Sequence, residues 1–407
     1  MAWHEPTTLG GAFDAARAVL VEWFPKSSPG ETYTGMSAFS RRHGAEILAI
    51  VMGRLRELLR GLSLRGGCWK VHGWVLIGGD GTRAPAPRTK RNLAGLGGMG
   101  RDRKNPQAWL TLLLHLPTGL LWSFVADRGD AAERGHVKSM LGTMPEDSLY
   151  LGDAGFVGYD FWNAMMESGQ GFLIRVGSNV SLIKGLARAT GAKARIDPAA
   201  GIVWLWPRRE QKGKKRPGGA LMLRLIVLHD GKKPVYLVTN VLDCKRLTAD
   251  HAREFYRMRW GVELWFRALK QTMNRPKLRS CAPDQAKLEL SWMAVSLGVL
   301  GLLHLEGLIK AGEDPRTATV AGALKVVREG LSRPGGRRRG KSRLLRRLGE
   351  EKKDAYVRGG PKRTGRYPKK NNRKRPSGSP KIRDASEAEK RKYQELVRRP
   401  SERVFTA

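Results

Sequence analysis

The stretch "FYRMRWGVELWFRALKQ", residues 255–271, combines apolar and polar side chains in a pattern that fits one helix. Its large apolar residues recur at three- and four-residue spacing and form one stripe of a helix that turns about 100° per residue. An arc of roughly 60° beside that stripe holds Tyr256, Arg259, Glu263 and Lys270. A solvated face would lie opposite the stripe, so this placement predicts a polar cluster with a single glutamate at the rim of a pocket.

The net charge of the chain indicates a polyanionic partner. The sequence has 407 residues with 75 Lys and Arg against 37 Asp and Glu, which gives a net charge of +38. A field of that sign attracts nucleic acid or an anionic membrane surface, and nucleic acid is the simpler candidate. The length is sufficient for at least one large core and for two or three domains.

The sequence lacks the marks of a secreted or disulfide-stabilised protein. Its start, "MAWHEPTTLGG", has no basic segment followed by an apolar one, so no secretory signal is expected. Cys68, Cys244 and Cys281 lie far apart without C-x-x-C spacing, which argues against a zinc ribbon and a disulfide framework. The apolar run 290–305 is too short and too polar to span a bilayer comfortably and predicts a buried helix. We expect a reducing, cytoplasmic compartment.

Changes in periodicity divide the chain into five regions. We expect an N-terminal helical, DNA-binding region at 1–68, because apolar residues there recur at helical spacing. An α/β core follows in two parts, 69–176 and 234–312, and the second part includes the apolar helix. Short strands around a basic turn predict a β insertion at 177–233. Residues 313–407 are expected to form a basic, largely disordered arm with one candidate helix at 386–399, because 331–407 alone contain 27 basic and 8 acidic residues.

Turn and cap residues locate individual elements of the core. The segment "AWLTLLLHLPTGLLWSFVAD" is expected to be a hairpin that turns at residues 117–119. Helices are expected at 133–144 and 159–168, and Thr248 is a candidate N-cap for the helix that leads into the opening stretch.

Three carboxylates are the candidate catalytic groups. Asp80 follows the apolar strand "WVLIGG", Asp153 follows "SLYLG", and Glu263 lies on the opening helix. Each has an ordinary alternative: an Asp before Gly is often a turn residue, and Glu263 can pair with Arg259 or Arg267 at i,i±4 spacing. Together, however, they supply the hard oxygen ligands with which two Mg²⁺ ions clamp the attacking and leaving oxygens of a phosphoryl transfer.

The opening stretch also fits a known signature. "FYRMRWGVELWFRALK" matches Y-x2-R-x3-E-x6-K and resembles the DDE transposases of the insertion-sequence group called YREK transposases. "DGTRAPAP" is similar to the first catalytic block of that family and "GDAGF" to the second. The resemblance covers roughly residues 69–271, with the β insertion before the third block. One position departs from the pattern, because an Arg is common after the second Asp and this chain has Ala154.

The resemblance implies an RNase H-like catalytic core and a cut-and-paste DNA transposase. Asp80, Asp153 and Glu263 would be the ligands of Mg²⁺, for which Mn²⁺ can substitute. Tyr256, Arg259 and Lys270, whose residue types suit phosphate oxygens, would hold phosphates of the transposon end. The implied partners are double-stranded DNA, at the transposon ends and the target, and a second copy of the chain in the DNA complex. The implied location is the bacterial cytoplasm, in association with the nucleoid.

Aromatic residues near the β insertion are candidates for stacking a flipped base. Relatives that cut through a DNA hairpin carry a tryptophan on the strand that leaves the insertion, and Tyr236 falls at the similar place here. Alternatively, Tyr236 is an ordinary strand residue. Trp204 and Trp206 alternate with Leu205 and so share one side of their strand, which offers a second platform. Arg175, on the strand "GFLIRVG", completes the expected DNA-binding set.

Other sequence patterns are weaker. "GGRRRGKS" at 335–342 satisfies the P-loop string, but it follows a basic tract with Pro334 where a P-loop needs an apolar strand. "GLGGMG" at 95–100 likewise lacks a preceding strand and predicts a loop. His304 is expected to be a core residue. Two alternative functions stay open: a catalytically inactive or domesticated basic DNA-binding protein, and a P-loop ATPase.

Overall fold

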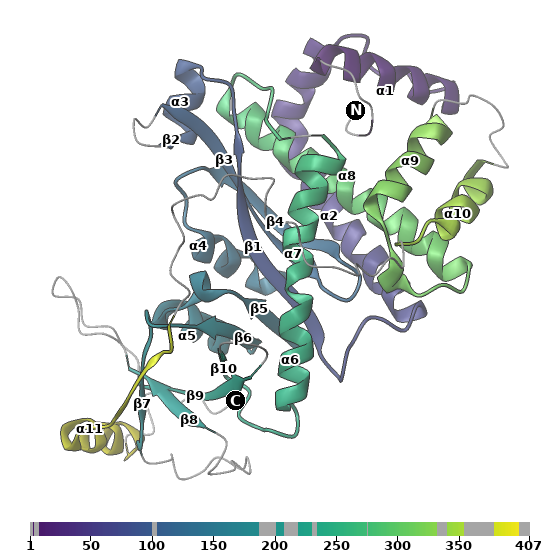
Figure 1. Cartoon of the computed structure of the whole chain (residues 1–407). Helices are drawn as coiled ribbons and strands as arrows, with labels where there is room; N and C mark the ends of the chain where they lie inside the picture. Colours follow the sequence, from purple (N-terminus) through teal and green to yellow (C-terminus); the bar gives the residue numbers. More distant parts are fainter. Residues whose placement is uncertain are drawn as a thin grey trace, which may run out of the picture. The chain divides into compact units, whose positions relative to one another are not determined.

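The structure is a computed structural model with a mixed α/β fold, and the chain divides into two compact units (Figure 1). Unit 1 consists of Met1–Ser148 and Arg257–Lys352, and unit 2 consists of Leu149–Tyr256 and Lys353–Ala407. Each unit is therefore assembled from two separate stretches of chain. The residues that the structure describes are 3, 8–99, 104–186, 201–206, 219–229, 234–274, 276–331, 340–353 and 378–398.

The strands of unit 1 form an antiparallel arrangement around β3. The long strand β1 (Val75–Pro85) pairs with β3 (Asn105–His115), and β4 (Leu120–Arg128) pairs with β3 as well. The short strand β2 (Gly98–Met99) pairs with the start of β3. The β3–β4 hairpin turns where the sequence predicted, with Gly119 in the left-handed region at φ 66°.

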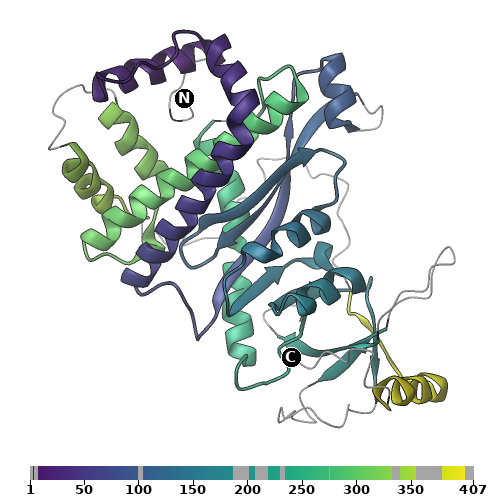
Figure 2. The ribbon, with the colours of Figure 1, turned by 180° about the vertical axis from the view of Figure 1, so that it is seen from behind.

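Two long helices form the core of the helical part of unit 1. The helix α2 (Tyr33–Arg65) packs along α8 (Pro283–Lys310), as Figure 2 shows from behind. Gly44 lies at their contact, where a Cβ would be 2.9 Å from Leu288 Cδ2 and the leucine side chain would have to shift. The structure therefore does not separate residues 1–68 as a domain, because the apolar side of α2 is buried against a helix that lies far along the chain.

The helix α8 is buried, as the apolar run predicted. Among the described residues it is the one helix long and apolar enough to cross a membrane, but 61% of its most apolar window is buried inside the protein. His304 is a core residue of this helix and places Nε2 2.7 Å from the backbone oxygen of Glu351. These contacts are those of a core helix.

Shorter elements surround the strands and long helices of unit 1. They are α1 (Leu9–Trp23), α3 (Lys90–Leu96), α4 (Glu133–Met140), η1 (Leu141–Thr143), α7 (Trp260–Arg267), the π-helix η3 (Ala268–Thr272), η4 (Pro315–Thr317), α9 (Val320–Leu331) and α10 (Gly340–Glu350).

Unit 2 contains a sheet with the strand order β5–β6–β10–β9–β8–β7–β11. The strands β5 and β6 are parallel, as are β7 and β11, whereas the pairs β6–β10, β10–β9, β9–β8 and β8–β7 are antiparallel. The strands are β5 (Ser148–Gly152), β6 (Gly171–Val176), β7 (Ser181–Lys184), β8 (Ile202–Leu205), β9 (Leu221–Leu228), β10 (Val235–Thr239) and β11 (Lys381–Asp384). The helices are η2 (Ala154–Phe156), α5 (Tyr159–Glu167), α6 (Ala249–Met258) and α11 (Glu387–Arg398).

The expectation of a largely disordered arm at 313–407 is wrong for the described part of that range. It contains α9 and α10 in unit 1 and β11 and α11 in unit 2. The basic composition hid the amphipathic helix α10, in which Leu345 and Leu348 are buried, Arg346 is exposed, and Arg347 is half-buried and paired with Glu329 of α9. Residues 332–339, 354–377 and 399–407 lie outside the described residues, and so does most of the P-loop string.

Candidate active site

One face of β1 carries the first candidate carboxylate. The register of β1 with β3 is unbroken from Ile77 to Pro85, so residues 78, 80 and 82 point to the same side. On that side a Cβ at Gly78 would lie 3.0 Å from Val262 Cγ2 of α7. Farther along, the Lys270 ammonium donates a hydrogen bond of 2.6 Å to Thr82 Oγ1. Asp80 therefore lies between two points at which its strand face meets the α7–η3 helix.

The spacing of these two points is consistent along both elements. From Val262 to Lys270 a helix advances roughly 12 Å, and from Gly78 to Thr82 a strand advances roughly 13 Å. The helix thus follows β1 in the same direction, and Figure 1 shows α7 passing over the strand. The absence of a side chain at Gly78 lets the helix approach closely, which brings the Glu263 region of α7 to the face that carries Asp80.

The opposite face of β1 is closely packed. The Arg83 guanidinium lies 4.1 Å from the centroid of the Trp109 ring and donates to the Gly129 backbone oxygen. A Cβ on Gly81 would overlap the Trp109 indole and lie 2.6 Å from Glu133 Oε1. The residue after Asp80 must therefore be glycine, because packing from α4 and β3 leaves no room for a side chain.

Asp80 lies inside β1 and is not the turn residue of its ordinary alternative, whereas the local contact of Glu263 agrees with its alternative. Asp80 is half-buried, and its Oδ1 accepts a hydrogen bond of 2.8 Å from the Gly81 amide. Glu263 accepts from Arg259 Nη2 at 3.3 Å, so the predicted i,i+4 pair is present.

The sequence predicted that the opening stretch, residues 255–271, forms one helix. In the structure it is not one continuous α-helix. The helix α6 ends at Met258, α7 begins at Trp260, and the π-helix η3 begins at Ala268. The 100° rule applies only within regular α-helix, so the predicted arc of roughly 60° does not extend from Tyr256 to Lys270. Single π-turns recur at functional sites because they alter the direction of one side chain. Here the π-turn carries Lys270.

Tyr256, Arg259 and Lys270 have different surroundings. Tyr256 is a half-buried residue of α6 and belongs to unit 2. The Arg259 side chain is 15% exposed and is bound to Glu263, in unit 1. Lys270 is also in unit 1, and burial lowers the pKa of its ammonium.

Asp153 follows a fully buried strand of unit 2. It caps the short helix η2, and its Oδ1 accepts a hydrogen bond of 2.7 Å from the Gly155 amide. Ala154, which departs from the family pattern, is the first residue of η2. Asp153 thus belongs to a different unit from Asp80 and Glu263, and among the described residues no group of three or more His, Cys, Asp or Glu is arranged to hold a metal ion.

The candidate base-stacking residues are divided between the two faces of the unit 2 sheet. Trp204 pairs with Met222, and the register through β9 and β10 places it on the face that also carries Arg175. Tyr236 pairs with Val176 and Val227, which puts it on the opposite face. The sequence grouped all these residues as one DNA-binding set, but β alternation separates them.

Trp204 is a core residue in this structure. It is 4% exposed and lies in a cluster with Ile183, Met222 and Tyr393, whose ring centroid is 6.3 Å away at an interplanar angle of 73°. Trp206 packs against the same cluster, with the Lys392 ammonium 5.6 Å from its ring centroid. The C-terminal helix α11 therefore occupies the aromatic surface that the sequence offered for a base. Tyr236, in contrast, is partly exposed.

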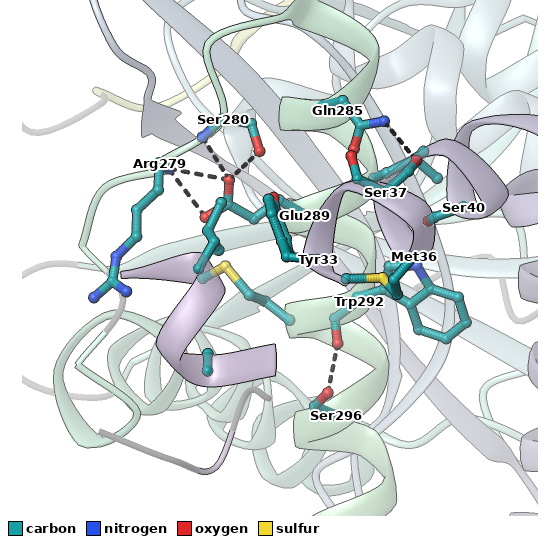
Figure 3. Close-up of a pocket in the computed structure, with 14 residues that line it drawn as sticks. Tyr33, Met36, Ser37, Ser40, Arg279, Ser280, Gln285, Glu289, Trp292 and Ser296 are labelled. Atoms are coloured by element: carbon teal, nitrogen blue, oxygen red, sulfur yellow. Dashed lines mark hydrogen bonds between the residues drawn. The ribbon is translucent and has the colours of Figure 1, made fainter. Parts of the chain in front are cut away.

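A cavity of about 340 Å³ lies between α1, α2 and α8, and Figure 3 shows the side chains that line it. Its carboxylate, Glu289, accepts hydrogen bonds from the Arg279 amide and from the amide and hydroxyl of Ser280. Burial, with Glu289 nearby, raises the pKa of the Tyr33 phenol. None of the sequence-predicted site residues lines this cavity. Glu289 fixes the loop after η3 and is not a candidate catalytic acid.

Sequence reasoning missed Thr82. The signal was available, because Thr82 is two residues after Asp80 on a strand and so shares its face. What the sequence could not supply was its contact partner, Lys270, which is 188 residues away.

Comparison with known proteins identifies the class of this chain. Residues 79–298 match the family described as "Transposase DDE domain", which is more than half of the chain. The chain belongs to this DDE transposase family.

A curated relative and a solved structure show more distant similarity. The chain is 25% identical over 230 residues to "Transposase InsG for insertion sequence element IS4" of Escherichia coli (strain K12), a match that covers 54% of this chain and 49% of the relative. The chain thus spans about half the length of the curated relative it matches. A cryo-EM structure of the piggyBac transposase synaptic complex with hairpin DNA aligns with a TM-score of 0.36 and 12% identity, over 67% of this chain and 57% of that one.

Proposed function

We propose that this protein is a DNA transposase that binds the terminal inverted repeats of its insertion sequence, cleaves the DNA there and joins the 3′-hydroxyl ends to target DNA. The observation that carries the proposal is the position of Asp80 between two contacts of its strand face with the helix that bears Glu263 and Lys270. Membership of the DDE transposase family supports the same reaction class. We place the chain in the YREK group and its core among RNase H-like folds.

Asp80, Asp153 and Glu263 would hold two Mg²⁺ ions, or Mn²⁺ in their place. The donor set fits, because carboxylate oxygens are the ligands that these hard cations prefer. When bound, the ions would neutralise charge on the reacting phosphate and activate the attacking oxygen.

The basic residues of the site supply the other half of the chemistry. Arg259 and Lys270 place a guanidinium and an ammonium beside Glu263 and Thr82, where they would bind phosphate oxygens of the DNA end. The hydroxyl of Tyr256 would donate a hydrogen bond to a phosphate of the same DNA strand. Among the aromatic candidates we assign the base-stacking role to Tyr236, because it is partly exposed while Trp204 is buried.

The proposed partners follow from charge and reaction. With a net charge of +38 the chain would bind double-stranded DNA at the element ends and at the target, largely through release of counterions. A cut-and-paste reaction acts on two ends, so we propose a homodimer in the DNA complex. The proposed location is the bacterial cytoplasm, in association with the nucleoid.

A direct assay tests this function. The purified full chain is incubated with Mg²⁺ and a labelled duplex taken from the DNA that flanks its gene, and strand cleavage at the repeat boundary is measured. We expect cleavage that stops with Asp80→Asn and persists with Asp284→Asn, an exposed α8 carboxylate paired with Lys287. Binding without any cleavage by the unmodified chain would favour the alternative, a catalytically inactive or domesticated DNA-binding protein.

A further inference from the structure

Thr82 is in direct contact with Lys270 at the candidate active site. It lies two residues beyond Asp80 on the same face of β1, so the two Cα atoms are roughly 7 Å apart. The Lys270 ammonium donates to its hydroxyl at 2.6 Å, which is at the short end of the range for such bonds. The contact joins the strand of the first carboxylate to the π-turn after the third.

The chemical nature of this contact leaves the ammonium able to bind an anion. A threonine oxygen is neutral, so it orients the cation without cancelling its charge, unlike the carboxylate that binds Arg259. An ammonium has three donors, and this bond uses one of them. Half-burial of Lys270 weakens screening by water, so a phosphate oxygen placed there would interact strongly.

On the basis of the proposed function, we propose that Thr82 is a positioning residue: its hydroxyl holds the Lys270 ammonium against the DNA phosphate that reacts beside Asp80. The π-turn explains why such a tether is needed. In this wider turn the side chain of Lys270 leaves the helix in a direction that the α-helical pattern does not set, and a long, flexible lysine side chain has many rotamers to lose. A fixed partner on β1 selects one of them before the DNA arrives.

The first test compares two substitutions at residue 82. Thr82→Val keeps the shape and removes the hydroxyl, whereas Thr82→Ser keeps the hydroxyl. We expect Thr82→Val to lower the single-turnover cleavage rate of the flanking-repeat duplex by about 10- to 100-fold, since small errors of placement are costly in a preorganised site. Thr82→Ser should recover most of the rate. The matched control is Thr111→Val on β3, which removes a buried hydroxyl on the opposite sheet face, next to His136.

A double-mutant cycle separates positioning from structural damage. If Thr82 acts through Lys270, Thr82→Val should cost nothing further in a Lys270→Met background. The same penalty in both backgrounds, or a Thr82→Val rate equal to that of the unmodified chain, would overturn the inference.

A readout without DNA distinguishes failure of this inference from failure of the proposed function. Acetic anhydride labelling followed by mass spectrometry gives the reactivity of Lys270 relative to the exposed Lys325 of α9. We expect Thr82→Val to change that ratio at least threefold, about the effect of losing one hydrogen bond, and Thr111→Val to leave it unchanged. Failed cleavage by the unmodified chain would reject the transposase function; intact cleavage with an unchanged ratio would reject only the role of Thr82.

Discussion

At the scale of single residues, His115 is a buried neutral imidazole. It is fully buried in β3, with Nδ1 2.8 Å from Thr118 Oγ1 and Nε2 3.1 Å from the Trp69 backbone oxygen, and its ring stacks on Trp69. A carbonyl can only accept, so Nε2 carries the proton and Nδ1 accepts from the threonine hydroxyl. Burial lowers the pKa of His115 to about 4 from a usual 6.5.

This histidine makes stability depend on pH in a defined window. Below 6.5 the unfolded chain takes up a proton at His115 that the folded chain does not, so the stability present above pH 6.5 is lost as the pH falls toward 4. The loss is at most about 3 kcal/mol in the free energy of unfolding. Urea denaturation at pH 7 and pH 5 measures it, and His115→Gln should reduce the difference between the two values. An equal pH dependence in both proteins would contradict a neutral buried His115.

The three carboxylates should be separable from DNA binding. We expect Asp80→Ala, Asp153→Ala and Glu263→Ala each to abolish Mg²⁺-dependent cleavage of end DNA while affinity changes little, because each loses a metal ligand and no basic contact. Affinity is measured in Ca²⁺ and cleavage in Mg²⁺ on the same duplex. Nicking retained by one variant would remove that residue from the ligand set.

Gly81 should tolerate no side chain. The Cβ of Gly81→Ala would overlap the Trp109 indole and crowd Glu133, so we expect a loss of about 1–3 kcal/mol in the free energy of unfolding. Gly53→Ala on α2 is the matched control, because a Cβ there meets nothing within 4 Å, and it should stabilise the helix by up to about 1 kcal/mol. Urea denaturation measures the free energy of unfolding of both variants. Equal changes in the two variants would show that the packing around Gly81 is loose.

At the scale of elements, β11 completes the unit 2 sheet and α11 packs against it. The strand β11 pairs in parallel with β7, and Tyr393 of α11 packs on Trp204. Replacing Tyr393, which is 4% exposed, with alanine should cost about 3 kcal/mol in the free energy of unfolding. It should also shift Trp fluorescence to the red as Trp204 gains water. The exposed Glu395→Ala on the same helix should do neither; an unshifted spectrum in Tyr393→Ala would mean that α11 does not cover Trp204.

The two faces of the unit 2 sheet allow a test of base flipping. If the enzyme cuts through a hairpin, Tyr236→Ala should lower the ratio of hairpin to nicked product on a labelled end duplex, because a lost stacking contact costs roughly 1–3 kcal/mol per base. Trp204→Ala should instead reduce stability, since the indole is in the core. A ratio that falls only in the tryptophan variant would place the base pocket on the other face.

Local patterns predicted elements well and their ends less well. Alternation and turn residues located β1, the β3–β4 hairpin and the position of Asp153 directly after β5, and the Thr248 hydroxyl does accept from the His251 amide at the start of α6. Asp80 was expected to close its strand, but it lies in the middle of β1, because the ladder with β3 continues to Pro85. The break at Arg259 and the π-turn were not predictable, because tertiary contacts, here between Lys270 and Thr82, select among helical variants of similar energy. The helix α10 was missed because a high density of charge masked a few buried residues, whereas α11 lies within the candidate helix at 386–399.

At the scale of the whole molecule, the sequence between Lys353 and Gly378 offers a way to vary charge alone. Residues 354–377 contain nine Lys or Arg and one acidic residue, and they lie between described elements of the chain. Replacing the nine with Gln should flatten the dependence of log K on log salt by about 0.9 for each lost phosphate contact. Discrimination between end DNA and random DNA should persist. An unchanged salt slope would show that this segment contributes no phosphate contacts.

The two-stretch construction of unit 1 has a consequence for biosynthesis. The helix α2 emerges from the ribosome early, but its packing partner α8 is translated more than 200 residues later. Until then the part of α2 that packs on α8 stays uncovered, and contacts of such long sequence separation form slowly. A messenger interrupted by a stop codon or frameshift before α8 would therefore yield a fragment in which this part of α2 is exposed, and we expect that fragment to aggregate rather than to work as a smaller domain.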